Sequence, residues 1–445
     1  MKQLIILGNG FDLAAGLKSS YSDFFLDRFK HLFKKESMDI HDLTDLNDDF
    51  EQKQTEIMND LFSAKNDKEL SSNIDYFRKF CDKWFHDQTP NRWDIIFLFA
   101  KCCIGKDPQS YEWQDVESVI YEVLTIAFDL NSKSENKISY EDRVTFNSQE
   151  ISGKDAFKIA VNNISSVEEN SVEVRATELL TELKKFESNF ASFIKNQIDY
   201  NDSKSDYLSK AKEIFENISL SRISENNHKA TTEIDVLNFN YSLDERFEEI
   251  TTRNINSWTN IHGVAFFDDV NSKNAIKSKD EYNFEYQLPA PIFGIDNHNF
   301  EDNQSEFDLR ILFTKAYRVI ENDINRIRIS KGYSNVGLIT IYGHSLGSAD
   351  YSYFEAVFDE NDLYNSGCRI EYFYYPGESK NDTIIYKKKA ITRLYNLLEN
   401  YGESLDKNHG KNIISKMNLE NRLSVVPIKK TNDMVDNNVR IHRYY

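Results

Sequence analysis

The chain has 445 residues, a formal net charge of −19, and hydrophobic residues at 40% of its positions. This length and this apolar content exclude a disordered chain and predict a folded protein with more than one structural unit. The acidic balance also argues against a nucleic-acid partner, because such a surface repels the phosphate backbone.

The cysteine and hydropathy patterns indicate the compartment. The four cysteines have no C-x-x-C spacing, so the sequence predicts neither a disulfide framework nor a metal site, and it suits a reducing cytoplasm. No apolar run approaches the ~20 residues of a membrane helix, and the N-terminal run is too short for a signal peptide. We therefore expect a soluble, cytoplasmic protein with no membrane partner.

The first predicted element is a buried strand at residues 3–7, which runs directly into Gly-Asn-Gly. Glycines at such a turn permit positive φ and bring backbone N–H groups close to a phosphate. The dinucleotide fingerprint G-x-G-x-x-G is incomplete, because Leu13 occupies its last position. Two readings stay open for residues 8–12: a tight strand-to-helix turn, in which Asp12 caps the helix, or a phosphate-binding loop.

The long middle of the chain reads mostly as helices. Apolar residues recur at helical spacing in residues 114–130 and 172–198, whereas residues 131–155 are polar and without periodicity. We expect a mostly helical insertion over residues 27–230, with residues 131–155 forming a surface loop.

Further strands are predicted late in the chain, from continuous apolar runs at residues 233–242, 259–263, 336–345 and 368–375. Such runs are typical of strands buried on both faces of a parallel sheet. They alternate with helical patterns at residues 307–330 and 386–402. This alternation predicts an α/β fold, in which a Rossmann-like parallel sheet is flanked by helices. We expect its core at residues 1–26 plus 231–385, followed by a C-terminal helix and tail at 386–445.

Residues 343–347 read GHSLG and match the G-x-S-x-G nucleophile elbow of the α/β-hydrolases. A hydrolase nucleophile needs a later histidine at a strand end. Only His409 and His442 follow, and neither comes after a predicted buried strand. We therefore expect Ser345 to contact a ligand, against the alternative of a serine esterase.

Several spaced motifs carry a family resemblance. They are LGNGFDLAAGLKSSYSDFF, YEWQDVE, LNFNYS, IHG, FGID and IYGHSLGSAD, in this order along the chain. On these motifs the sequence is identified as a member of the AbiH family of phage abortive-infection proteins. The resemblance implies a phage-defence effector that responds to a phage-derived trigger or partner protein. It leaves a homo-oligomer open.

A looser resemblance is to sirtuin-type NAD-consuming domains, which carry in order a Gly-Ala-Gly loop, Gln-Asn-Ile-Asp, His-Gly and Gly-Thr-Ser-Leu. The counterparts here are Gly8-Asn9-Gly10, Phe239-Asn240-Tyr241-Ser242, His262-Gly263 and Gly343-His344-Ser345-Leu346. Ser242 stands where sirtuins have Asp, and the zinc-binding cysteine pairs of deacylases are missing. The resemblance implies a sirtuin-like core that binds and hydrolyses NAD, or a related nucleotide, and does not deacylate.

This implied NAD glycohydrolase assigns roles to individual residues. His262 is the expected general base, since a free imidazole titrates near neutral pH, and Asn240 is expected to orient the ribose or the attacking water. The nucleotide-binding residues are expected to be Gly8, Asn9, Gly10, Phe11, Asp12 and Tyr241, together with Gly343, His344, Ser345 and Leu346, which face the adenosine half. Plainer roles stay open for His262, as a structural histidine, and for Asn240, as a turn residue.

Two other functions stay open at this stage. A nuclease would gather a metal ion on Asp12, Asp115, Glu117 and Asp296, although Asp115 and Glu117 also suit the start of a helix. A non-catalytic sensor would bind a nucleotide at the same loops without turning it over.

Overall fold

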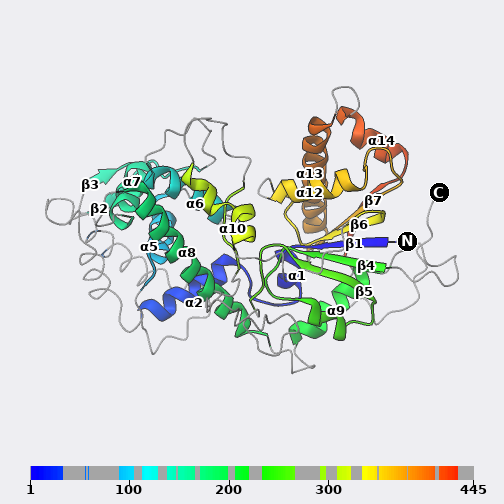
Figure 1. Ribbon diagram of the computed structural model, residues 1–445, viewed down its shortest axis with the longest axis horizontal. Helices are drawn as coiled ribbons and strands as arrows, with labels where there is room; N and C mark the ends of the chain where they lie inside the picture. Colours follow the sequence, from blue (N-terminus) through cyan, green and yellow to red (C-terminus); the bar gives the residue numbers. More distant parts are fainter. Residues whose placement is uncertain are drawn as a thin grey trace, which may run out of the picture. The chain divides into compact units, whose positions relative to one another are not determined.

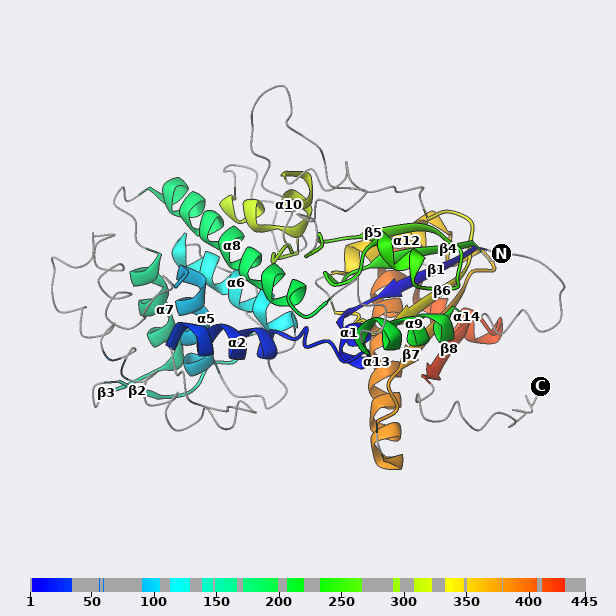
Figure 2. The same ribbon diagram turned by 90° about the horizontal axis from the view of Figure 1, so that it is seen from below.

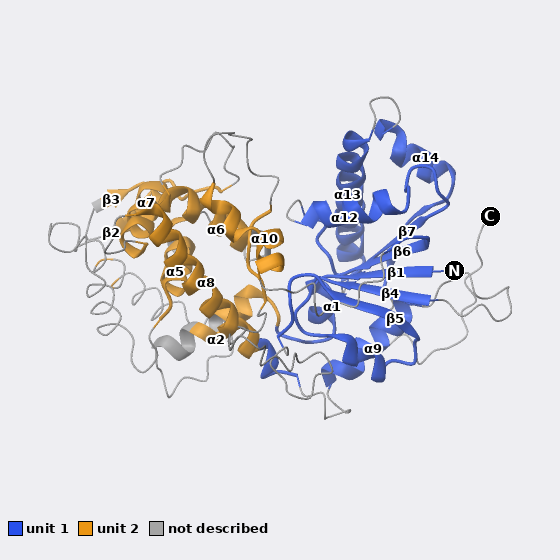
Figure 3. Cartoon of the chain, in the orientation of Figure 1, with its two compact units in different colours: residues 1–18, 194–284, 325–445 blue, residues 19–193, 285–324 orange. Residues whose placement is uncertain are grey.

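The computed structural model describes residues 2–33, 56, 59, 90–104, 113–128, 138–146, 149–165, 171–198, 206–219, 233–265, 291–296, 308–321, 333–347, 350–377, 379–405 and 410–428. The chain forms two compact units (Figure 3). Unit 1 comprises residues 1–18, 194–284 and 325–445, and unit 2 comprises residues 19–193 and 285–324.

Unit 1 is built on a six-stranded sheet in which all neighbouring strands are parallel (Figure 1). The strands are β1 (Lys2–Leu7), β4 (Glu233–Asn238), β5 (Ile255–Asn260), β6 (Val336–Tyr342), β7 (Arg369–Tyr374) and β8 (Leu423–Pro427). Their order in the sheet is β5-β4-β1-β6-β7-β8. Counted along the chain, this is the 3-2-1-4-5-6 order of the Rossmann fold. The predicted α/β class and parallel sheet are confirmed.

Helices cover both faces of this sheet: α1 (Asn9–Ala14), α9 (Asp206–Ile218), α12 (Tyr351–Glu360), α13 (Lys380–Ser404) and α14 (Ile413–Leu419). The alternation of β1 shows which face meets which helix. Leu4 and Ile6 pack in one core cluster with residues of α12 and α13, whereas Gln3 donates from Nε2 to the carbonyl of Ile218 at the end of α9. Figure 2 shows α13 projecting beyond the sheet.

The structure differs from the expected elements at three places. The strand expected at residues 259–263 is β5, which begins earlier, at Ile255. Part of the expected C-terminal tail is β8, the outermost strand beside β7. The surface loop expected at residues 131–155 contains the antiparallel pair β2 (Val144–Phe146) and β3 (Gln149–Ile151), and α7 begins at Gly153. Strands this short carry too few residues for a periodic signal.

Unit 2 is mostly helical. Its described helices are α2 (Tyr21–Phe33), α5 (Arg92–Cys103), α6 (Trp113–Ala127), α7 (Gly153–Ile164), α8 (Val172–Lys195) and α10 (Lys315–Glu321). The predicted helices at residues 114–130 and 172–198 are confirmed as α6 and α8. Aromatic rings form much of the core, and the rings of Phe186 and Phe190 each pack edge to face with the ring of Phe24. No described helix of either unit is long and apolar enough to cross a bilayer.

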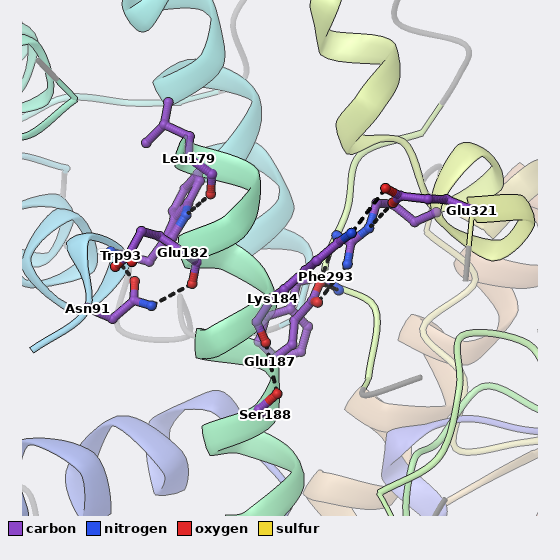
Figure 4. Close-up of polar contacts among 10 residues, drawn as sticks. Asn91, Trp93, Leu179, Glu182, Lys184, Glu187, Ser188, Phe293 and Glu321 are labelled. Atoms are coloured by element: carbon purple, nitrogen blue, oxygen red, sulfur yellow. Dashed lines mark hydrogen bonds and ion pairs between the residues drawn. The ribbon is translucent and has the colours of Figure 1, made fainter. Parts of the chain in front are cut away.

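A buried ion pair joins two elements of this unit. Arg318 of α10 donates to both carboxylate oxygens of Glu187 on α8, at 3.0 and 2.8 Å. The backbone N–H of Phe293 also donates to Glu187, at 2.8 Å (Figure 4). Burial raises the pKa of Glu187, while Arg318 and the other donors act in the opposite direction. The pair has the bidentate geometry that a buried carboxylate requires.

Candidate functional site

The candidate residues of unit 1 follow the carboxyl ends of four strands. Residues 8–12 follow β1, residues 239–242 follow β4, His262 follows β5, and residues 343–346 follow β6. Strands β1 and β6 are neighbours in the sheet, and the chain builds outward from them in opposite directions. In open α/β sheets, ligands bind outside the carboxyl ends of the strands at such a reversal.

Glycines let the loops after β1 and β6 touch through their backbones. Gly343 has φ +73°, and a Cβ there would lie 2.2 Å from the Phe11 nitrogen. A Cβ on Gly8 would lie 2.5 Å from the His344 Cα, and one on Gly10 would lie 2.8 Å from the Gly343 Cα. Only glycine fits these positions, because a real Cβ does not approach so closely. The glycines are thus required by the packing of one loop on the other.

The contact between the two loops also occupies backbone N–H groups that a phosphate-binding loop would offer to its ligand. Gly8 donates to the carbonyl of Tyr342 at 3.0 Å, and Gly10 donates to that of Gly343 at 2.8 Å. Phe11 donates to the carbonyl of Gly8, also at 2.8 Å. These three amides already have acceptors inside the protein. Residues 8–12 therefore form a turn that packs against the loop after β6. A contact from this turn to a ligand would have to use groups other than these three amides.

Asn240 connects the ends of three strands. Its side-chain Nδ2 donates to the carbonyl of Gly8 at 3.0 Å, and its backbone N–H donates to Oδ1 of Asn238 at 3.1 Å. Asn260, at the end of β5, donates from Nδ2 to the carbonyl of Asn240 at 3.0 Å. The turn role considered for Asn240 is thus present. A ligand contact by its side chain would be made through Oδ1.

Asp12 lies buried in α1, beside the ends of β1 and β4. Tyr207 of α9 donates its hydroxyl to Oδ1 of Asp12 at 2.8 Å. Burial raises the pKa of Asp12 from 3.8 to about 7, against the opposing hydrogen bonds of Ser242 and Tyr207. Asp12 stands in the first turn of α1, but its carboxylate meets a hydroxyl from another helix. A carboxyl group that titrates near neutral pH is suited to proton transfer.

His262 and His344 meet one carboxylate. Nε2 of His344 lies 3.3 Å from Oδ2 of Asp350, and Nε2 of His262 lies 3.9 Å from Oδ1 of the same residue. Nδ1 of His344 accepts the backbone N–H of Leu346 at 3.0 Å. His262 is only 1% exposed. The structure thus brings together two histidines that lie at the ends of β5 and β6.

Aromatic rings enclose this group. The Phe239 ring lies 4.5 Å from the His344 ring and 5.8 Å from the His262 ring, centroid to centroid. Tyr353 of α12 lies 5.5 Å from His262, and Phe354 lies 5.0 Å from His344. These rings lower the local dielectric, which strengthens electrostatic interactions among the polar groups.

The remaining predicted ligand residues also follow strands β1, β4 and β6. Phe11 is fully buried and packs edge to face on Tyr342, and Tyr241 is buried after β4. Ser345 is half-buried, and Leu346 has a positive φ of 58°. The two later histidines that an esterase reading would need, His409 and His442, lie outside the described residues.

Sequence reasoning missed three participants, Asp350, Tyr207 and Phe239. Asp350 closes the motif IYGHSLGSAD, and Phe239 lies within LNFNYS, so the motifs contained both without indicating their contacts. Tyr207 lies on α9, 195 residues from Asp12, and nothing in its helical pattern sets it apart.

The acidic residues of the nuclease reading lie in both units. Asp12 belongs to unit 1, whereas Asp115, Glu117 and Asp296 belong to unit 2. Glu117 is ion-paired with the buried Lys315 at 2.5 Å. Within the described part of the chain, no group of three or more His, Cys, Asp or Glu side chains is arranged to hold a metal ion.

The sequence matches a known family over residues 4–374, and the family is described as bacteriophage abortive infection AbiH. No curated protein and no solved structure matches it. The match covers most of the chain and includes every strand of the sheet except β8. The chain therefore belongs to the AbiH family, and this membership implies a role in phage abortive infection.

Proposed function

Starting from membership of a phage abortive-infection family, we propose that unit 1 binds NAD or a related nucleotide at the reversal of its sheet and hydrolyses the nicotinamide–ribose bond. Loss of the cofactor would stop the metabolism of the infected cell. The observation that carries the proposal is the 3-2-1-4-5-6 strand order, with Asn240, His262 and His344 all at the carboxyl ends of strands next to β1 or one strand removed. This is the place and topology at which dinucleotides bind.

In the proposed reaction, a water molecule attacks C1′ of the ribose. The C1′–N bond breaks, its electron pair stays on the nicotinamide nitrogen, and His262 takes the proton from the water. Oδ1 of Asn240 orients a ribose hydroxyl, because Nδ2 of the same amide is held by the carbonyl of Gly8. The loop at residues 343–346 contacts the adenosine half.

The transition state of this reaction carries positive charge on the ribose. The negative charge of Asp350 supports its stabilisation, since this carboxylate lies beside His344, whose ring packs against Phe239 and Phe354. Fixed groups of this kind, in a site from which water is excluded, are the main source of electrostatic catalysis.

The test is nicotinamide release from NAD, and separately from NADP, by the purified protein. We expect release by the wild type and none by His262→Ala or by His262→Gln, which keeps the side-chain volume closer to that of histidine. Equal melting temperatures of the variants and the wild type would show that the fold is kept. In infected cells we expect the same variants to lose toxicity.

Other results would change the proposal. Release by both wild type and His262→Ala would remove His262 as the base. Release only after addition of infected-cell lysate would identify an activating trigger. Tight nucleotide binding without release in either condition would favour the sensor, and absence of both binding and release would reject the nucleotide site.

A further inference from the structure

The hydrogen bond from Leu346 fixes the protonation of His344. Because Nδ1 of His344 accepts this backbone N–H at 3.0 Å, Nδ1 carries a lone pair and Nε2 carries the ring proton. That proton faces Oδ2 of Asp350 at 3.3 Å. The backbone carbonyl of His344 is also fixed, since it accepts the hydroxyl of Tyr372 at 2.8 Å. His344 is thus held from its ring and from its main chain.

Asp350 occupies the N-cap position of α12, where aspartate usually accepts a backbone N–H of the first turn. Its side chain makes no such hydrogen bond. The carboxylate instead lies between the two imidazoles, with Oδ2 toward His344 and Oδ1 toward His262. A side chain that gives up the capping interaction for two histidines indicates a role beyond the stability of the helix.

We propose that Asp350 and His344 are positioning residues for His262, an inference that rests on the proposed function of the site. His344 holds the carboxylate through Nε2–H, and Oδ1 of Asp350 faces Nε2 of His262. These two atoms are 3.9 Å apart, beyond hydrogen-bond distance, so Asp350 acts on His262 through its negative charge while His262 takes the proton from the attacking water. Asp350 then stabilises the imidazolium.

The arrangement separates the tasks of the three residues. In the proton transfer, His262 contacts the reacting water, whereas Asp350 and the His344 ring act through His262. His344 cannot replace His262 as the base, because a proton on its Nδ1 would break the bond to Leu346. The rings of Phe239 and Phe354 pack on His344 and restrict its rotation.

Four variants test this arrangement in the full chain. Asp350→Asn should lower kcat for nicotinamide release roughly 10²-fold or more and change KM less than about threefold, because only proton transfer is impaired. His344→Gln keeps a donor at the position of Nε2 and should stay within about tenfold of the wild type. His344→Asn keeps only the acceptor of the Leu346 amide and should fall as far as Asp350→Asn. Glu355→Gln, on the same helix, is the control and should have wild-type kinetics.

A measurement without NAD separates this inference from the proposed function. In protein labelled with ¹⁵N-histidine, we expect His344 to show an unprotonated Nδ1 and a protonated Nε2. We also expect Asp350→Asn, but not Glu355→Gln, to shift the ring signals of His262. Unchanged His262 signals in Asp350→Asn, or a protonated Nδ1 on His344, would overturn the inference. If the wild type releases no nicotinamide with or without infected-cell lysate, the proposed function fails and these signals alone decide the inference.

Discussion

Glu187 of unit 2 and two carboxylates of unit 1, Asp350 and Asp12, are buried among different kinds of partner. In unit 2, Glu187 receives two bonds from Arg318 and one from the Phe293 amide, all between 2.8 and 3.0 Å. In unit 1, the carboxylate oxygens of Asp350 lie 3.3 and 3.9 Å from the Nε2 atoms of two histidines. Asp12 accepts a hydrogen bond from a tyrosine hydroxyl. A carboxylate fixed by a permanently charged guanidinium has little freedom to exchange protons. Histidines and hydroxyls exchange them readily. The difference indicates a structural role for Glu187, whereas the partners of Asp350 and Asp12 are suited to proton transfer.

The largest effect is expected from breaking the pair in unit 2. Arg318→Met leaves Glu187 buried without its cation and should lower the free energy of unfolding by about 3–5 kcal/mol. The double variant Arg318→Met, Glu187→Leu should recover much of this loss, because no charge remains buried. The measurement is urea unfolding followed by circular dichroism.

The control for this experiment is an exposed pair of the same unit, Arg143 with Glu150, whose side chains are 74% and 60% exposed. Arg143→Met should change the free energy of unfolding by less than about 1 kcal/mol. If Arg318→Met were as mild as Arg143→Met, the structural role given to the buried pair would be wrong.

An intermediate effect is expected at Asp12, and it depends on pH. Because its pKa is raised from 3.8 to about 7, folded Asp12 holds a proton that the unfolded chain has released between these values. The free energy of unfolding therefore falls as the pH rises through this window, and above it the charged, buried carboxylate has its full cost. Asp12→Asn should match the wild type near pH 4 and be more stable by on the order of 4 kcal/mol above pH 7.

Melting temperatures of the wild type and Asp12→Asn across this pH range measure the difference. Asp206→Asn is a matched control, since Asp206 precedes Tyr207 on α9 and its side chain is 98% exposed. It should show no such pH-dependent gain. A constant difference between Asp12→Asn and the wild type at all pH values would contradict the raised pKa.

The smallest effect is expected at Ser345. If the loop after β6 contacts a nucleotide and does not carry a nucleophile, Ser345→Ala should keep nicotinamide release within about fivefold of the wild type, since one ligand hydrogen bond is worth only about 1 kcal/mol. Complete loss of activity, together with covalent labelling of the wild type by a fluorophosphonate, would support the alternative that the protein is a serine esterase.

The sequence predicted the centre of the fold better than its edges. Strands β1 and β6 are buried on both faces by helices, so their apolar runs are continuous and easily recognised. The edge strand β8 has a single buried residue, Val426, among its five. The polar sequence of β5, INSWTN, likewise resembles a loop more than a buried strand.

For the site, the sequence predicted which loops lie at the sheet's carboxyl ends but not how they touch. The histidines at 262 and 344 follow recognisable strands and were expected there. Their common partner Asp350 could not be deduced, because the contact with His262 joins residues far apart in the chain. The acceptors of the glycine amides could not be predicted for the same reason, since the amide of Gly10 reaches the carbonyl of Gly343 only when β1 and β6 are paired.

The position of β1 in the sheet also determines when the sheet and the site can assemble during translation. This strand is made first, yet its neighbours β4 and β6 begin at Glu233 and Val336. At roughly 5–20 residues per second, a ribosome needs about 17–70 s to travel from Lys2 to Asp350. Strand β1 can pair with β4 once Asn238 has been made, but His262, His344 and Asp350 cannot assemble until Asp350 has been made. A translation product that stops before β6 therefore lacks two of these three residues.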